Sequence, residues 1–369
     1  MSGTRQIGGS AVHVDQRTRR PRIADVARQA GVSKTAVSFA FNSPDRLSTV
    51  TASRIREVAE SLGYRPHPVA RMLSQGRTMA VGVLTPQMLS VVLPNPFFAA
   101  FSEGVALGAE ESGYGVHLIS PVQGSLARAV GRATVDGVVV LGLSGEHPDI
   151  EAIRQAGLPI VLVDSTALPE LPSVDVDDEG GAFAAAEHLV GLGHRDFLVI
   201  GVEPPLPATT ADPDGVTSRR LRGYRRSLAA HGIDLPETAI MVGPAHLAGG
   251  IAAFERAWED GLRPTAVLCM SDAMAIGAMR AARQHRLAVP RDVSIVGFDD
   301  VEMAQYTDPP LTTVHQPIRR KGHEAVRTLL SLIDGHEPDR SEHRRLETRL
   351  VIRGSSGPVP PRRQEVAIS

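Results

Sequence analysis

The chain has 369 residues, of which 42% are apolar, and a formal net charge of −2 at pH 7. This length is sufficient for two or three domain cores, and near-neutrality argues against a protein that binds polyanions over its whole surface. No stretch approaches the roughly 18 consecutive apolar residues that a membrane-spanning helix needs, and the N-terminus lacks the apolar middle of a secretory signal. The one cysteine, Cys269, lies in an apolar run, so we expect a buried thiol and a cytoplasmic protein.

The charge is unevenly divided along the chain. Residues 1–77 hold 13 Lys and Arg against 5 acidic residues, a net charge of +8, so the remainder carries −10. A basic N-terminal part on an acidic body is expected when only one domain meets nucleic-acid phosphates. Within the basic part, we expect residues 1–20 to be a disordered lead-in.

Residues 23–42 predict two short helices joined by a glycine turn. In the first helix, apolar residues recur at the spacing of one helix face (Ile23, Val26, Ala27 and Ala30). Gly31 is expected to end it, and Ser33 to cap the second helix. A third helix, capped by Thr49 or Thr51, would close a three-helix core. Two helices joined in this way are typical of the helix-turn-helix, in which the second helix enters the DNA major groove.

From Met79 onward, apolar runs alternate with helical stretches, which predicts parallel α/β structure with buried strands. The predicted strands cover residues 80–84, 115–120, 136–142, 159–164, 196–201, 266–270, 293–299 and 345–353. The predicted helices cover residues 98–112, 126–132, 179–192, 218–231, 250–260 and 274–285, with a last one ending near 333. The proline- and arginine-rich tail, residues 354–369, is expected to be disordered.

Ligands of open α/β sheets bind beyond the carboxyl ends of the strands. Polar and aromatic residues of this chain fall at such positions: Phe97, Phe98, Asp164, Arg220, Ser271, Asp272 and Asp299. An Asp at a strand end is also often the N-cap of the next helix, an interpretation that fits Asp272. The sequence shows no histidine spacing for a metal, no glycine-rich phosphate loop and no GxSxG motif. We therefore expect neither an enzyme nor a bound metal or cofactor.

The segments DVARQAGVSKTAVSFAFN, LGYRP and VARMLSQGRT resemble, in order and spacing, the DNA-binding headpiece and hinge of the LacI/GalR family of bacterial transcriptional regulators. The blocks VDGVVVLG, SDAMAIGAMRAA, VPRDVSIVGFDD and PPLTTVHQP resemble the effector domain of the same family. The resemblance implies an all-α helix-turn-helix headpiece at residues 21–65 and a hinge helix with linker at 66–78. An α/β two-lobed periplasmic-binding-protein-like domain for effector binding and dimerisation would follow at 79–353, with crossings between the lobes near 176, 315 and 345.

The resemblance also implies which residues contact DNA: Ser33, Lys34, Thr35, Ser38, Phe39, Asn42, Arg46, His67, Val69, Ala70 and Leu73. Ser33, Ser38 and Asn42 would hold phosphates or the helix itself. Phe39 replaces a polar or basic residue common at this position; it can contact a thymine methyl but cannot read guanine as an arginine would. Leu73 would wedge into the minor groove and kink the duplex, with a simple linker role as the alternative.

Six of the strand-end residues are implied to bind a small-molecule effector, a sugar or sugar derivative: Phe97, Phe98, Asp164, Arg220, Ser271 and Asp299. The implied function is an effector-responsive repressor of sugar uptake or metabolism genes that binds a near-palindromic DNA operator as a homodimer. An activator of the same family is the alternative within this class. A solute receptor of the same fold would lack the basic headpiece, and a Rossmann-type oxidoreductase would need the missing glycine fingerprint.

Overall fold

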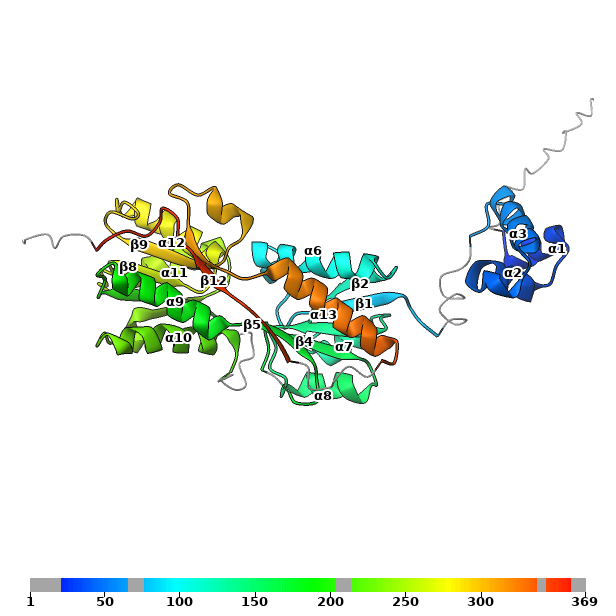
Figure 1. The fold of residues 1–369 in the computed structure, drawn as a ribbon, viewed down its shortest axis with the longest axis horizontal. Helices are drawn as coiled ribbons and strands as arrows, with labels where there is room; N and C mark the ends of the chain where they lie inside the picture. The colour runs from blue at the N-terminus through cyan, green and yellow to red at the C-terminus, as the bar shows by residue number, and fades with distance from the viewer. Residues whose placement is uncertain (1–20, 66–75, 167, 204–213, 337–342, 360–369) are drawn as a thin grey trace, which may run out of the picture. The chain divides into compact units, whose positions relative to one another are not determined.

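The structure is a computed structural model that describes residues 21–65, 76–166, 168–203, 214–336 and 343–359. The chain divides into two compact units, the headpiece (residues 1–78) and the body (residues 79–369). Figure 1 shows their helices and strands. Among the described helices, none is long and apolar enough to cross a membrane.

Three short helices form the described part of the headpiece. They are α1 (Ile23–Ala30), α2 (Lys34–Asn42) and α3 (Thr49–Ser61), with the 3-10 turn η1 (Pro44–Arg46) between the last two. Gly31 ends α1 in the left-handed conformation at φ 65°, as predicted. The predicted N-cap of α2 is also confirmed, because the Ser33 Oγ accepts a hydrogen bond from the Ala36 N–H at 3.1 Å.

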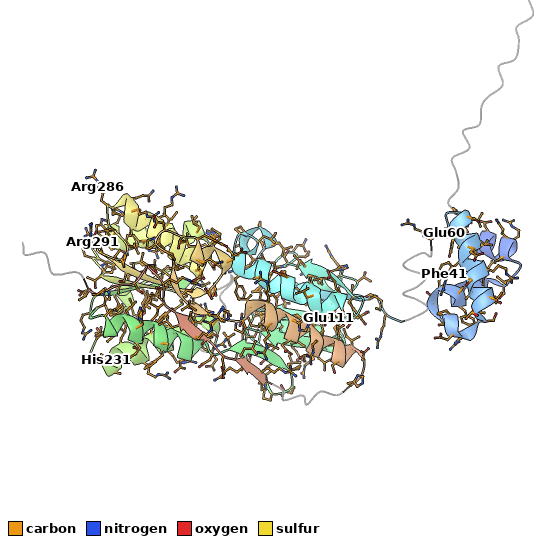
Figure 2. The ribbon with its side chains drawn as sticks, turned by 45° about the horizontal axis from the view of Figure 1, so that its top comes forward. Phe41, Glu60, Glu111, His231, Arg286 and Arg291 are labelled. Atoms are coloured by element: carbon orange, nitrogen blue, oxygen red, sulfur yellow. The ribbon has the colours of Figure 1, made fainter. Side chains whose placement is uncertain are left out.

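The cap of α3 differs from the prediction. Ser48 takes this position, where its Oγ accepts the Thr51 N–H at 3.2 Å; Thr49 is the first residue of the helix. The three helices bury a small core of Val26, Ala27, Ala30, Val37, Ala40, Ile55 and Ala59. Phe41 and Tyr64 pack against this core with their ring centroids 6.1 Å apart. Figure 2 labels Phe41 among the headpiece side chains.

The body holds two six-stranded sheets, one in each lobe. The strand order of the first sheet is β11–β5–β4–β3–β1–β2, and all neighbouring strands are parallel. Its strands are β1 (Ala80–Leu84), β2 (Gly115–Ile119), β3 (Gly137–Leu141), β4 (Ile160–Val163), β5 (Ser173–Val176) and β11 (His343–Leu346). The strand order of the second sheet is β12–β10–β9–β8–β6–β7, and within this sheet only β12 is antiparallel to its neighbour. Its strands are β6 (Phe197–Val202), β7 (Ile240–Gly243), β8 (Ala266–Cys269), β9 (Ser294–Asp299), β10 (Thr312–His315) and β12 (Arg349–Val351). The sequence analysis did not predict β5, β7 and β10. Each has only four residues and includes polar or glycine positions, so none is a continuous apolar run.

Helices cover both faces of each sheet. In the first lobe, α6 (Pro96–Glu110) and α13 (Ile318–Ile333) cover one face, and α7 (Leu126–Val130) and α8 (Pro148–Gln155) cover the other. In the second lobe, α9 (Asp178–Gly191) and α10 (Val216–Ala230) lie on one face, and α11 (Leu247–Glu259) and α12 (Asp272–Gln284) on the other. The remaining short helices are α5 (Leu89–Val92), η2 (Glu237–Ala239) and η3 (Glu302–Gln305). Figure 2 shows polar and charged residues such as Glu111, His231, Arg286 and Arg291 at the surface of the body.

The chain passes between the two lobes three times: from β5 to α9, from β10 to α13 and from β11 to β12. The last passage corrects the prediction of one strand over residues 345–353. His343–Leu346 pairs with β5 in the first sheet, whereas Arg349–Val351 pairs with β10 in the second. Helix α13 therefore packs on the first lobe although it follows most of the second lobe in sequence (Figure 1).

The expected disorder of the C-terminal tail is wrong for residues 354–359. Ser355 is fully buried, and its Oγ accepts the Thr312 N–H at 2.8 Å and donates to the Ile295 carbonyl at 2.6 Å. The carbonyl of Gly357 lies 3.0 Å from Nε2 of the buried His194. The segment is ordered because its backbone and serine side chains satisfy polar groups of the second lobe.

Glycines allow paired helices to touch backbone to backbone. A Cβ on Gly322 of α13 would overlap the carbonyl oxygen of Phe101 on α6, and a Cβ on Gly104 of α6 would overlap that of Arg319. Similar contacts occur at Gly223 between α10 and α9 and at Gly250 between α11 and α12. Close packing at Gly322 fixes the first turn of α13, which carries a buried lysine.

We predict that Gly322→Ala destabilises the protein by about 1–3 kcal/mol, because α6 and α13 must separate to admit the methyl group. The control is Gly191→Ala at the end of α9, where an added Cβ meets nothing within 4 Å. Chemical denaturation should show a loss for the first variant and no loss for the second. Equal stability of both variants would contradict the proposed close contact.

Candidate functional site

The exposed side of α2 carries Lys34 and Thr35. Ser33 caps the helix, and the half-buried Ser38 accepts a hydrogen bond through Oγ from Asn42 Nδ2 at 3.3 Å. Ser33, Ser38 and Asn42 therefore all bond within this helix, whereas Lys34 and Thr35 face solvent.

Phe39 and Arg46 lie together at this surface. The Cζ atom of Arg46, in η1, is 5.2 Å from the centroid of the Phe39 ring, a cation–π contact. Phe39 is half-buried and Arg46 is exposed. The other predicted DNA contacts, His67, Val69, Ala70 and Leu73, lie outside the described residues.

In the body, two predicted effector residues end central strands in strained backbone conformations. Asp164 follows β4 at φ 51°, and Asp299 ends β9 at φ 128°; both are buried. Left-handed conformations of this kind are costly for residues other than glycine and cluster at ligand-binding sites. Each carboxylate is thereby directed out of its strand, at the carboxyl edge of its sheet.

A buried chain of hydrogen bonds joins these two carboxylates. Lys321 of α13 is fully buried, and its Nζ donates to Asp164 Oδ1 and Oδ2 at 2.8 and 2.7 Å. The same Nζ donates to Gln316 Oε1 at 2.7 Å, and Gln316 Nε2 donates to Asp299 Oδ1 at 2.6 Å. Because Gln316 lies in the passage from β10 to α13, the chain of bonds runs from the first lobe to the second.

Arg220 continues this chain within the second lobe. Its Nε donates to Asp178 Oδ1 at 2.8 Å, and its Nη1 donates to the Met270 carbonyl at 2.5 Å and lies 4.0 Å from Asp299 Oδ1. The guanidinium also stacks on Phe298, with Cζ 3.6 Å from the ring centroid. Arg220 and Asp299, predicted from the sequence as one site, are therefore neighbours.

Arg219 forms a second bridge between the lobes. It binds Asp178 of the second lobe through Nε and Nη2 at 3.0 and 2.8 Å. Toward the first lobe, its Nη1 donates to the Ser165 carbonyl at 3.4 Å and its Nη2 lies 3.8 Å from Asp175. Arg219 and Arg220, adjacent in α10, therefore both bind the buried carboxylate of Asp178, and Arg219 also contacts the first lobe.

The remaining predicted effector residues occupy different environments. Phe97 is half-buried, with its ring centroid 4.9 Å from Lys321 Nζ, but Phe98 is 3% exposed and packs in the core of the first lobe. Ser271 is the N-cap of α12, where its Oγ accepts the Met274 N–H at 3.2 Å. The expectation that Asp272 caps this helix is therefore wrong.

Asp272 instead holds neighbouring segments together. Its Oδ1 accepts the Thr313 hydroxyl at 2.5 Å, and its Oδ2 accepts the Val301 N–H at 2.8 Å. Burial, and then the charge of Asp299, raise the pKa of Asp272 well above its ordinary value. Asp272 is thus a buried carboxyl that tends to keep its proton.

Burial and nearby charges shift the other carboxyl pKa values in opposite directions. Burial would raise the pKa of Asp178, but Arg220 and Arg219 outweigh it and hold the pKa below its ordinary value. Burial raises the pKa of Asp299 to about 6, although Arg220 and Gln316 favour its charged form. Burial, and then the charge of Asp164, raise the pKa of Asp175. The site therefore combines one firmly ionised carboxylate with others that ionise at a cost.

Sequence reasoning missed Asp175, Asp178, Arg219, Gln316 and Lys321 as members of this site. Only one signal pointed to Lys321: the chain has two lysines among its 39 basic residues, Lys34 and Lys321. The others occupy the ends of elements that meet only after the lobes pack together.

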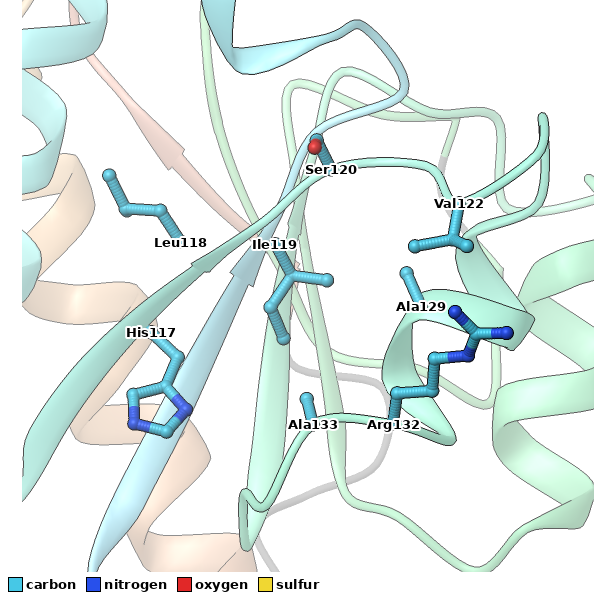
Figure 3. Close-up of a pocket in the computed structure, with 8 residues that line it drawn as sticks. All are labelled: His117, Leu118, Ile119, Ser120, Val122, Ala129, Arg132 and Ala133. Atoms are coloured by element: carbon cyan, nitrogen blue, oxygen red, sulfur yellow. The ribbon is translucent and has the colours of Figure 1, made fainter.

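A separate hollow of about 470 Å³ lies beside the edge strand β2 (Figure 3). Figure 3 shows residues that line it: His117 and Ile119 of β2, Ser120 after the strand, and Arg132 and Ala133 of the segment that follows α7. None of the predicted effector residues lines it. In the described part of the chain, no group of three or more His, Cys, Asp or Glu side chains is arranged to hold a metal ion.

Known families match both units. The description "Bacterial regulatory proteins, lacI family" matches residues 22–67, and "Periplasmic binding protein-like domain" matches residues 186–356. The chain is 32% identical over 351 residues to the HTH-type transcriptional regulator CelR of Thermobifida fusca. The aligned region covers 92% of this chain and 99% of CelR.

The chain belongs to the LacI family. It is a DNA-binding transcriptional regulator with a helix-turn-helix headpiece and a periplasmic-binding-protein-like body, and members of this family are not enzymes.

Solved structures of the family share the fold of this LacI-family regulator. A lac repressor dimer bound to operator and the anti-inducer ONPF matches with a TM-score of 0.77 and 28% identity over 92% of this chain and 100% of that one. The complex of the regulator CelR with cellobiose matches with a TM-score of 0.68 and 29% identity over 91% of this chain and 100% of that one.

We predict that Lys321→Met lowers the free energy of unfolding of this LacI-family regulator by about 3–5 kcal/mol, because Asp164 then remains buried without its cation. The double variant Lys321→Met/Asp164→Asn should recover part of the loss. Arg327→Met, at an exposed position of the same helix, is the control and should change stability by less than about 0.5 kcal/mol. A double variant as unstable as the sum of its single changes would contradict the pairing.

We predict that Asp299→Asn gains stability relative to wild type as the pH rises from about 4 to 7. The folded wild type keeps the Asp299 proton up to a pKa of about 6, whereas the unfolded chain loses it near the ordinary value of 3.8. The Asp299 carboxyl therefore contributes a loss of stability across this window, and the uncharged amide does not. Urea denaturation at several pH values measures the difference, and parallel curves would count against a raised pKa at Asp299.

Proposed function

We propose that this LacI-family regulator represses genes for sugar uptake or metabolism, binds a near-palindromic operator as a homodimer, and changes its operator affinity when a sugar or sugar derivative binds between its lobes. The observation that carries this proposal is the pairing of a capped helix-turn-helix with a polar network at facing strand ends. A solute receptor without a DNA role would not need the helix-turn-helix. The CelR–cellobiose complex supports a sugar as the class of effector.

The headpiece supports DNA binding through charge and exposure. Its described residues 21–65 include seven basic and four acidic side chains. Lys34 and Thr35 face solvent on the second helix of the motif, the helix that enters the major groove in this class of domain. In the hinge, Leu73 would act as the minor-groove wedge, with Ala70 small enough for two hinges to approach each other.

Exposed apolar side chains support a homodimer. In the first lobe, Leu118 lies on the edge strand β2 and Leu107 on the adjacent α6. In the second lobe, Val242 lies on the edge strand β7 and Leu247 on the following α11. A second copy would cover these side chains and bring two headpieces to two half-sites, as in the lac repressor dimer on its operator.

The polar network supports an effector site between the lobes. Asp164 and Asp299 can each accept hydrogen bonds from vicinal hydroxyls, and Arg220 offers a planar donor. A ligand that exchanges hydrogen bonds with these groups would act on the contacts that join the lobes. Its differential affinity for two lobe angles would shift the population of DNA-binding dimers.

The test uses the purified full-length chain, an operator selected from random DNA, and fluorescence anisotropy with a panel of sugars that includes cellobiose. We expect a preferred near-palindromic site and a sugar that changes its affinity. Arg220→Ala/Asp299→Ala should abolish the sugar response and retain operator binding. Arg225→Ala is the control that should retain both, because the Arg225 side chain, on the same helix, is 42% exposed and pairs with Glu237.

Absence of any preferred site over bulk competitor DNA, with or without sugars, would overturn the proposal. A sugar response that survives the double substitution would place the effector elsewhere. Activation of transcription from the selected site in a reconstituted system would replace the repressor assignment with that of an activator.

A further inference from the structure

Phe39 is an aromatic residue that the headpiece core does not use. Among residues 21–65, Phe41 and Tyr64 pack against the buried core, and Phe39 is absent from that cluster. Phe39 lies on α2, the helix that also presents Lys34 and Thr35 to solvent. A half-buried ring on this helix therefore has no role in closing the three-helix core.

Arg46 covers this ring. Its Cζ atom lies 5.2 Å from the ring centroid, and within residues 21–65 no ion pair joins its guanidinium to a carboxylate. The 3-10 turn that carries Arg46 is held by two backbone hydrogen bonds, from the Arg46 N–H to the Ser43 carbonyl at 3.1 Å and from the Leu47 N–H to the Pro44 carbonyl at 3.0 Å. The turn and the ring together restrict where the guanidinium can point.

The two side chains complement each other chemically. A phenyl ring has no hydrogen-bond donor, but it can contact the methyl group of thymine. A guanidinium can donate two hydrogen bonds to O6 and N7 of guanine. Successive bases of one DNA strand are about 3.4 Å apart along the helix, so two groups 5.2 Å apart, such as the Arg46 guanidinium and the Phe39 ring, can reach neighbouring base pairs.

We propose that Arg46 is a specificity-determining residue that reads guanine in each half-site, and that Phe39 is the positioning residue that holds it. The half-site then contains a T·A pair next to a G·C pair, contacted by Phe39 and Arg46 respectively. The inference rests on the proposed binding of a specific DNA site by the headpiece. Arg46 in η1 would thereby provide the guanidinium that α2 does not provide at position 39, where it has a phenylalanine.

The other role open to an exposed arginine beside a recognition helix is a phosphate contact. A phosphate contact would strengthen binding to all sequences alike and would be preserved by lysine, which keeps the charge. Lysine can also donate to O6 and N7 of guanine, but its ammonium does not have the planar fork that can lie over a ring and donate two parallel hydrogen bonds to one base. Arg46→Gln, which removes the charge, therefore separates the two roles, because loss of a phosphate contact weakens binding to all sequences alike, whereas loss of a guanine contact lowers one base preference.

The experiment is selection from a random duplex library, followed by competition binding with every single-base variant of the selected site. We expect Arg46→Gln to reduce the preference for guanine at one position per half-site by about tenfold, and Arg46→Lys to reduce it by less, with other positions unchanged. Phe39→Leu should weaken the same guanine preference although Arg46 is intact, and Phe39→Tyr should restore it.

The matched control is Arg54→Gln, at an exposed position of α3, which should leave the order of base preferences as in wild type. Thermal melting checks that each variant is folded. An unchanged guanine preference in Arg46→Gln, or equal weakening for all sequences in that variant, would overturn the guanine-reading role. If wild type itself selects no site, the proposed operator binding fails. If wild type selects a site and the variants keep its guanine preference, operator binding stands and only the present inference fails.

Discussion

Charges buried between the two lobes must be neutralised by one another, and this constraint organises the body of the protein. Asp164, Asp178 and Asp299 are each less than a tenth exposed, as are Arg220 and Lys321. An isolated buried charge would cost several kcal/mol, so each cation must be held within hydrogen-bonding distance of a carboxylate. The lobes therefore meet in a fixed arrangement of ion pairs that only their close approach completes.

The helix packing serves this arrangement. Lys321 reaches the lobe boundary because α13 returns to the first lobe after the second has been built, and Gly322 lets that helix lie directly against α6. Gln316 lies in the same returning segment and touches both Lys321 and Asp299. A ligand that replaces any of these bonds acts on the segments that connect the lobes, which relates effector chemistry to lobe geometry.

The headpiece follows a different physical logic. Its helices have 8, 9 and 13 residues and bury a small core, so end caps such as Ser33 and Ser48 contribute a large share of what holds them. Lys34, Phe39 and Arg46 lie outside that core. Because the surface residues carry little of the folding energy, they are open to change without loss of the fold, and base recognition can differ among relatives with the same three helices.

The sequence alone determined the helix-turn-helix, the alternation of strands and helices, and the placement of Asp164 and Asp299 at strand ends. These features depend on local periodicity, turn residues and the rule that parallel strands share a carboxyl edge. Tertiary structure alone decided that Lys321, Gln316, Asp178 and Arg219 complete that group and that Ser271 is a helix cap. It also decided that residues 345–353 divide between two sheets. These features leave no periodic signal in the sequence, because they form only when distant segments of the chain meet. They are ion pairs between residues far apart in sequence, and a predicted strand that is divided by the passage between the lobes.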